Sequence, residues 1–136
     1  MPSDLEEKDA IREVMAEYCF RLDNDRFADM AALFTEDGTW DTAFGKGTGR
    51  AEVEALVQRI RQSATVRPRA IHHVTNIVIK LEGSSAKIFS NWMTVQNSEQ
   101  GPKIGSAGSY TDDMVKQGGR WLFRYRKIDR FIHDKA

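Results

Sequence analysis

The chain has 136 residues, its 20 Lys and Arg are balanced by 20 Asp and Glu, and 40% of it is hydrophobic. This length suits one core, so we expect a single domain over residues 1–136. The balanced charge and ordinary apolar content argue against a disordered chain. They also argue against a protein that binds nucleic acid through bulk positive charge.

Cys19 is the only cysteine of the chain, which excludes an intrachain disulfide and a cysteine-rich zinc site. No apolar run approaches the roughly 18 residues of a membrane span, and the acidic N-terminus does not resemble a secretory signal. We therefore expect a cytoplasmic protein with no membrane partner, no nucleic-acid partner and no metal site.

The first half of the chain has helical periodicity. Ser3 and Glu6 form the pattern S-x-x-E, which predicts a capping box at the start of a helix. Apolar residues then recur at helical spacing over residues 11–22 and predict one buried stripe. This helix is expected to end near residues 23–25.

Shorter elements are predicted next. We expect a short helix with its apolar face over residues 27–34 and a turn at 36–38. A short strand over 39–44, a flexible glycine-rich link over 45–49 and a third helix over 50–62 follow.

The second half changes to the period of two that is typical of strands. After a chain break at residues 67–69, strands are predicted over 70–81, 86–96, 104–116 and 120–132, joined by hairpins. Helices followed by hairpin-connected strands indicate an α+β fold. We expect three N-terminal helices packed on one face of a curved, mostly antiparallel sheet that encloses a pocket.

The alternation over residues 70–81 separates two adjacent histidines. It places His73 on the inner face with the isoleucines and His72 on the opposite face. An inward histidine is either a hydrogen-bonded core residue or a catalytic base, and the pattern leaves both interpretations open.

Four other residues are candidates for a pocket. Asp23 falls at the end of the first helix, where the dipole disfavours a carboxylate, so it either pairs with a histidine or lies exposed in the turn. Tyr18 and Trp40 occupy apolar positions and belong to the core or to a pocket wall. Arg126 alternates with apolar residues and needs a partner, either in the pocket or in an ion pair with the acidic N-terminal helices.

Four stretches of the chain together resemble the SnoaL-like proteins of the NTF2-like superfamily. They are A-I-R-E-V-M-A-E-Y-C-F-R-L-D, A-A-L-F-T-E-D-G-T-W, H-H-V-T-N and G-S-Y-T-D-D-M-V-K-Q-G-G-R-W. The resemblance extends over roughly residues 5–130. It implies a cone-shaped α+β fold with a deep pocket and a homo-oligomer, a dimer or trimer, formed through the sheet.

The resemblance also implies site residues. In scytalone dehydratases and in the dehydrochlorinases of hexachlorocyclohexane, a pocket aspartate orients a histidine base, and the matching residues here are Asp23 and His73. Bile-acid 7α-dehydratases resemble this chain further, with a tyrosine five residues before the aspartate and a late arginine, which match Tyr18 and Arg126. The dehydrochlorinases have a lysine at the position of Tyr18, which argues against their reaction.

Three further residues match positions that contact substrate in these relatives. Trp40 takes the place of a dehydrochlorinase tryptophan. Tyr110 falls near a late asparagine of scytalone dehydratase, and Asn91 lies near the mid-chain aspartate of bile-acid 7α-dehydratase. Thr42 falls near a second tyrosine of scytalone dehydratase. Because Tyr110 and Thr42 both differ from that enzyme, scytalone is not the expected substrate.

The function implied by the resemblance is that of a lyase or isomerase without a cofactor, of the dehydratase type. It would act on a cyclic, largely apolar small molecule through an Asp–His general-base dyad. Two alternatives remain open. One is a non-catalytic binding or scaffold subunit, like the small subunits of ring-hydroxylating dioxygenases, and the other is a polyketide cyclase.

Overall fold

The computed structural model describes residues 2–63 and 69–134. The chain begins with a long helix, α1 (Asp4–Asp23), whose start is fixed by a capping box. The Ser3 hydroxyl accepts a hydrogen bond from the Glu6 N–H, and the Glu6 carboxylate accepts one from the Ser3 N–H, both at 3.2 Å. These bonds satisfy donors that the first helical turn leaves unpaired, so the predicted start of this helix is confirmed.

The second helix is shorter than the sequence pattern predicts. Helix α2 (Phe27–Ala31) ends before the last two apolar residues of the predicted segment. The Leu33 carbonyl accepts a hydrogen bond from the Phe123 N–H at 2.8 Å. At this point the backbone therefore pairs with a strand from the end of the chain instead of continuing the helix. The third helix, α3 (Arg50–Gln62), has the predicted bounds.

Six strands form one mixed sheet in the order β2-β1-β6-β5-β4-β3. Neighbouring strands are antiparallel except for β1 and β6, which run parallel. The strands are β1 (Phe34–Thr42), β2 (Gly45–Thr48), β3 (Ala70–Glu82), β4 (Ser85–Gln96), β5 (Lys103–Gln117) and β6 (Arg120–His133).

Two local predictions in the first half are wrong. Residues 36–38 lie within β1 and not in a turn, and most of the glycine-rich segment 45–49 forms β2, which pairs with β1. A Cβ on Gly38 would lie 2.8 Å from the Phe123 carbonyl oxygen. This glycine therefore serves close approach between β1 and β6, a role that a sequence pattern does not distinguish from a turn.

Strand β3 contains a bulge. The pairing of β3 with β4 shifts register between Thr75 and Val78, and Asn76 has a φ of +55°. Asparagine adopts this left-handed conformation more readily than most residues. The bulge adds one residue to the strand. Counting every second residue across the bulge therefore leads from one face of the sheet to the other.

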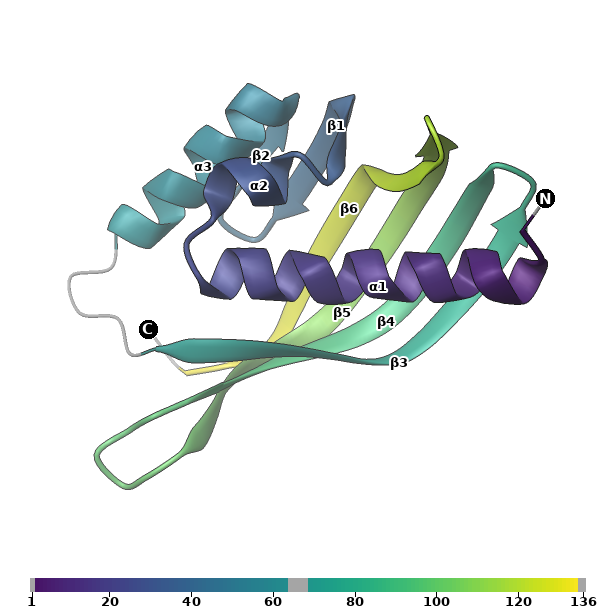
Figure 1. Cartoon of the computed structure of the whole chain (residues 1–136). Helices are drawn as coiled ribbons and strands as arrows, with labels where there is room; N and C mark the ends of the chain where they lie inside the picture. The colour runs from purple at the N-terminus through teal and green to yellow at the C-terminus, as the bar shows by residue number, and fades with distance from the viewer. Residues whose placement is uncertain (1, 64–68, 135–136) are drawn as a thin grey trace.

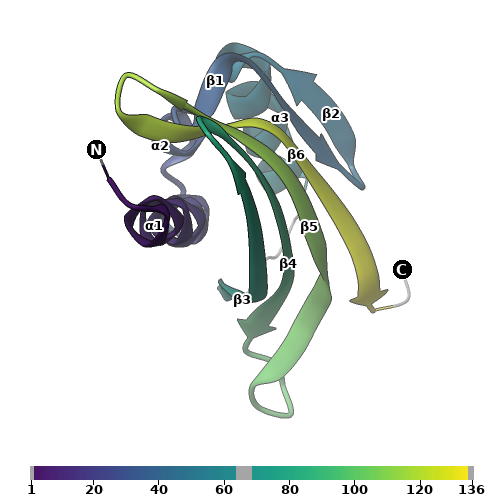
Figure 2. The same cartoon turned by 90° about the vertical axis from the view of Figure 1, so that its right-hand side faces the viewer.

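Strands β3–β6 curve, and the helices lie on one side of them, as Figure 2 shows. In Figure 1, α1 runs across these strands, while α2 and α3 lie beside the β1–β2 hairpin. The main core lies between helices and sheet and includes fully buried side chains from both, among them Ile11, Met15, Leu56 and Met114. This arrangement confirms the predicted α+β class with helices on one face of a curved sheet.

Within the described residues, no helix is both long and apolar enough to cross a membrane. The chain break predicted at residues 67–69 lies largely outside the described residues. The predicted hairpin turns of the second half are confirmed, with Gly83, Gly118 and Gly119 all at positive φ.

Candidate active site

A cavity of about 260 Å³ opens between the sheet and the helices. Its wall combines aromatic and aliphatic side chains with a few polar and charged groups, as is usual for sites that bind small molecules. The lining residues most relevant to chemistry are Tyr18, Asp23, Trp40, His72, Trp92 and Tyr110.

Asp23 and His72 form a hydrogen-bonded pair at the wall of this cavity. Asp23 is the last residue of α1, and its Oδ1 lies 2.5 Å from Nδ1 of His72 on β3. The second oxygen, Oδ2, accepts a hydrogen bond from the His72 backbone N–H at 2.8 Å. Strand β3 is at the edge of the sheet, so this backbone amide has no strand partner there, and Asp23 satisfies it instead.

The pair leaves one ring nitrogen of His72 for chemistry. An ionised carboxylate only accepts hydrogen bonds, so Nδ1 carries the ring proton and Nε2 is the basic nitrogen. The side chains of Asp23 and His72 are only 8% and 17% exposed. A buried carboxylate that fixes the tautomer of a histidine is the arrangement of a general base.

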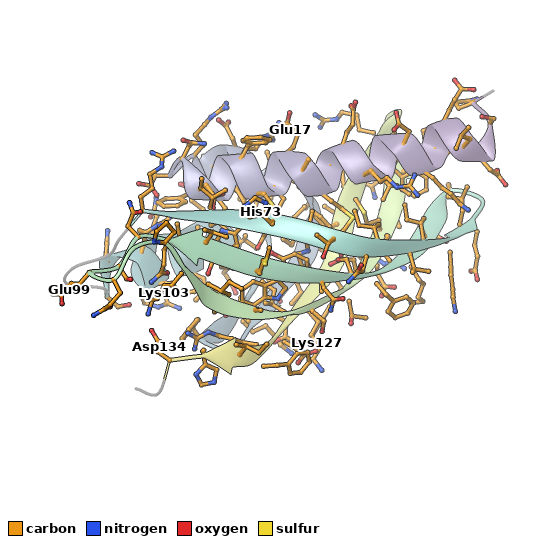
Figure 3. The ribbon with its side chains drawn as sticks, turned by 90° about the horizontal axis from the view of Figure 1, so that it is seen from below. Glu17, His73, Glu99, Lys103, Lys127 and Asp134 are labelled. Atoms are coloured by element: carbon orange, nitrogen blue, oxygen red, sulfur yellow. The ribbon has the colours of Figure 1, made fainter. Side chains whose placement is uncertain are left out.

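The structure contradicts the expected pairing of Asp23 with His73. Asp23 contacts His72, and His73 is exposed on β3, where Figure 3 labels it. The bulge at Asn76 explains the error. The prediction counts every second residue back from the isoleucines that follow the bulge. Because the bulge adds one residue, this count places every residue before it on the wrong face.

Tyr18 and Trp40, which the sequence places either in the core or at a pocket wall, contact each other and line the cavity. Trp40 Nε1 donates a hydrogen bond to the Tyr18 hydroxyl at 3.0 Å, and both side chains are buried. The Tyr18 oxygen therefore acts as an acceptor here, and among the described residues no acceptor is found for its own proton. Burial raises the pKa of Tyr18 to about 12, so the phenol stays protonated at neutral pH.

Arg126 does not line the cavity but lies directly behind it. It is fully buried, and its Nε and Nη2 donate to the two carboxylate oxygens of Asp112 on β5 at 2.8 and 3.1 Å. Its guanidinium carbon lies 4.2 Å from the ring centroid of Tyr18, 3.6 Å from that of Tyr110 and 4.4 Å from that of Phe123. Its partner is thus a strand aspartate, not the acidic N-terminal helices, and its guanidinium packs against the rings of the two tyrosines that line the cavity.

The two remaining predicted contact residues are placed differently from each other. Tyr110 is 2% exposed and lines the cavity, where burial raises the pKa of its hydroxyl well above the usual value. Asn91 lies between the buried residues Ser90 and Trp92 of β4, so its side chain is on the outer face and does not line the cavity. There its amide oxygen accepts a hydrogen bond from Asn76 at 2.9 Å. The expectation of a substrate contact for Asn91 is therefore not supported.

Several cavity residues were not identified from the sequence. His72 was assigned to the wrong face, and Trp92, Arg61 and Arg130 were not considered. The asparagine in the middle of β3 was the available signal for His72, since asparagine tolerates positive φ and marks bulges. The two arginines carry no local signal, because surface arginines are common and only the fold brings these two to the cavity.

Metal ligation finds no support in the part of the chain that the structure describes. Within residues 2–63 and 69–134, no group of three or more His, Cys, Asp or Glu side chains is placed to hold a metal ion. The acid–base groups that line the cavity are the imidazole of His72, the carboxylates of Asp23 and Asp134, and the phenols of Tyr18 and Tyr110.

A curved mixed sheet with helices and a cavity on one side is the architecture of the NTF2-like, or cystatin-like, class of folds. The chain belongs to the SnoaL-like domain family, whose model matches residues 3–127. No curated protein matches it significantly.

Solved structures extend this assignment. The chain is similar to a Novosphingobium aromaticivorans protein named "Putative Scytalone Dehydratase", at 27% identity over 98% of this chain and 92% of that one, with a TM-score of 0.79. It is also similar to a Mycobacterium tuberculosis protein of unknown function, at 25% identity over 92% and 72% of the two chains, with a TM-score of 0.82. Similarity to ActVI-ORFA of Streptomyces coelicolor, at 22% identity, 90% and 93% coverage and a TM-score of 0.78, shows the fold alone.

Proposed function

We propose that this protein is a lyase or isomerase of the dehydratase type, in which His72 removes a proton from carbon in a cyclic, largely apolar small molecule. The observation that carries the proposal is the 2.5 Å contact between Asp23 and His72 Nδ1 at the wall of the cavity. It prepares the opposite ring nitrogen as a base.

The reaction needs only groups that line the cavity. His72 Nε2 takes a proton from a carbon next to a carbonyl group, and the electron pair of the C–H bond forms a carbon–carbon double bond. In an elimination, the neighbouring C–O bond breaks and the hydroxide leaves as water by taking the proton from the His72 imidazolium, which returns the histidine to its neutral form. In an isomerisation, the proton returns to a different carbon. Asp23 holds the imidazole in position and stabilises the imidazolium that forms.

Tyr18 supplies the second polar function. Its hydroxyl proton is not used by Trp40, so it donates to the substrate carbonyl, where negative charge develops, or to the departing hydroxyl. A positioned general base contributes about 10²–10⁴ in rate, and loss of one oxyanion donor costs about 10²–10³. Both contributions depend on a site from which water is largely excluded.

Two observations favour an enzyme over a non-catalytic scaffold. The cavity is open to a volume of about 260 Å³ and is not filled by side chains. The Asp23–His72 pair lines this cavity, and a scaffold has no need of it there. The 27% identity to a protein named "Putative Scytalone Dehydratase" is consistent with this proposal. A polyketide cyclase would use the same enolate chemistry on a larger substrate.

The test is a proton-exchange assay in D₂O. A panel of hydroxylated cyclic ketones is incubated with the protein, and proton NMR follows both exchange at the carbon next to the carbonyl and loss of water. The His72→Gln variant should lose at least about 100-fold in rate. The His73→Gln variant, changed at the adjacent exposed residue, should keep the full rate.

Two results would contradict the proposal. Equal rates for the two glutamine variants would remove His72 as the base. Absence of exchange with every ketone in a wild-type protein that binds them would favour the non-catalytic alternative.

A further inference from the structure

The charged side chains that line the cavity are not equally neutralised. Four are present, Asp23, Arg61, Arg130 and Asp134. Asp23 is engaged by His72 through both carboxylate oxygens. Neither oxygen of the Asp23 carboxylate is therefore free to bind a ligand.

Arg61 is also engaged within the protein. One of its terminal nitrogens donates to the carbonyl oxygen of Leu22 at 2.8 Å and lies 3.0 Å from Oδ1 of Asp25. This arginine closes the C-terminal end of α1, where the helix dipole favours a positive charge. It is thus held in place without a ligand.

The fourth charged residue, Asp134, forms an ion pair at the rim of the cavity. Lys103, at the start of β5, donates a hydrogen bond at 2.7 Å to Asp134, which directly follows the end of β6. Figure 3 labels both residues at the same end of the molecule. Lys103 lowers the pKa of Asp134 most, and the charge of Arg130 adds to that effect.

Arg130 remains as the cation of the cavity lining without an ion pair within 4 Å, among the residues that the structure describes. It is half-buried on β6, and its guanidinium carbon lies 5.4 Å from the centroid of the Phe44 ring, in the turn between β1 and β2. This cation–π contact leaves the N–H donors of the guanidinium free of partners among the described residues, so they can bind an oxyanion.

The base and this arginine lie on strands at opposite sides of the cavity. Arg130 is in register with Gly108 on β5, Gly108 with Trp92 on β4, and Trp92 with Val74 on β3, two residues beyond His72. Three strand spacings separate the two backbones by about 14 Å. After both side chains have extended inward, the space left between them suits a molecule of one or two rings, in agreement with the volume of about 260 Å³.

We propose that the ligand of this cavity is a cyclic molecule that carries a carboxylate, which Arg130 binds at the rim. The orientation follows from charge. At the end that holds His72, the oxygens of Asp23 are occupied and Arg61 is already paired with Asp25, whereas Arg130 at the other end offers a positive charge without an ion pair among the described residues. The ring system then spans the apolar middle of the cavity, beside Trp92 and Tyr110. This inference names the substrate class of the proposed reaction and rests on that function only for the placement of the reacting carbon.

Binding of two matched probes tests the inference without any turnover. The probes are 2-naphthoate and the neutral 2-naphthylmethanol, and the signal is tryptophan fluorescence, since Trp40 and Trp92 line the cavity. Wild type should bind the naphthoate roughly tenfold or more tightly than the alcohol, because hydrogen bonds to a charged partner are strong. Added salt should weaken binding of the naphthoate alone.

The Arg130→Gln variant should lose this preference and keep its affinity for the alcohol. Arg124→Gln, a change at an exposed arginine of the same strand that does not line the cavity, is the matched control and should behave as wild type. Equal affinities of wild type for the two probes, no binding of either probe, or an undiminished preference in Arg130→Gln would each overturn the inference.

The same experiment separates this inference from the proposed reaction. His72→Gln should bind the naphthoate with at least wild-type affinity, because it keeps Arg130. If the preference depends on Arg130 but no ketone or hydroxy acid of the panel exchanges protons, only the reaction fails. If exchange occurs with neutral substrates and the carboxylate preference is absent, only the ligand class fails.

Discussion

Removal of the Asp112 charge should destabilise this protein more than any comparable change at its surface. Asp112 and Arg126 have side chains with no exposure to solvent and are joined by two hydrogen bonds. The Asp112→Asn substitution leaves the guanidinium charge buried, and the amide oxygen replaces only one of the two acceptors. A further nitrogen, Nη1 of Arg126, is buried and has no hydrogen-bond partner within residues 2–63 and 69–134. A buried charge that loses its partner costs about 3–5 kcal/mol.

This magnitude is a large share of the 5–15 kcal/mol that is typical of a domain, so the variant should remain folded only narrowly. For a chain of this size the melting temperature should fall by roughly 10–20 °C. The measurement is urea unfolding followed by circular dichroism, with a thermal melt as a second readout. Asp113→Asn is the control, because Asp113 forms an exposed pair with Lys87 on the neighbouring strand and should cost less than about 1 kcal/mol.

A second variant distinguishes a charge effect from general damage to the core. Replacement of both partners, as Asp112→Leu with Arg126→Met, removes the buried charge and keeps most of the apolar volume. It should recover much of the lost stability. Equal losses for Asp112→Asn and Asp113→Asn, or a double variant less stable than Asp112→Asn, would refute this account of the ion pair.

Two further predictions concern Tyr18 and the bulge. The pKa of Tyr18 is raised to about 12 by burial, whereas an unfolded tyrosine titrates near 10, so the native state holds this proton more tightly. The Tyr18 contribution to stability is present below pH 10 and is lost as the pH rises to about 12. Wild type should therefore lose up to about 2–3 kcal/mol more than Tyr18→Phe over this range in urea unfolding, and equal losses would contradict the burial argument. Asn76→Val should cost about 1–3 kcal/mol, because a β-branched residue disfavours a φ of +55°, whereas Asn76→Gly should be nearly neutral. Matched unfolding curves test this, and equal stability of the two variants would show that the bulge does not need its left-handed residue.

Local sequence signals were reliable where the determining interactions are local. The capping box at Ser3 and Glu6, the helix over residues 50–62 and the glycine turns between strands were all recognisable because neighbours in sequence satisfy them. Segment 36–49 was misread since its glycines serve contacts with distant elements, as Gly38 does with Phe123. No pattern within the segment distinguishes such a packing glycine from a turn glycine.

The candidate site shows the same division. Asp23 could be selected as a carboxylate at a helix end, but the strand parity that assigned its partner failed at a single inserted residue. The sequence indicates that Arg126 is a cation that needs a partner. Only the register of β5 with β6, which places Asp112 opposite Arg126, determines which residue that partner is. Arg130 had no signal at all, because its position at a cavity is a property of the folded sheet.

The sequence by itself therefore determined the α+β class, the period of each long element and the kinds of group available for acid–base chemistry. These follow from periodicity and side-chain chemistry, which each segment carries alone. The tertiary structure decided which histidine pairs with Asp23, which arginine packs against the tyrosines and which arginines line the cavity. Those choices depend on a bulge, a strand register and the curvature of the sheet, and each of these is set by interactions between residues far apart in the chain.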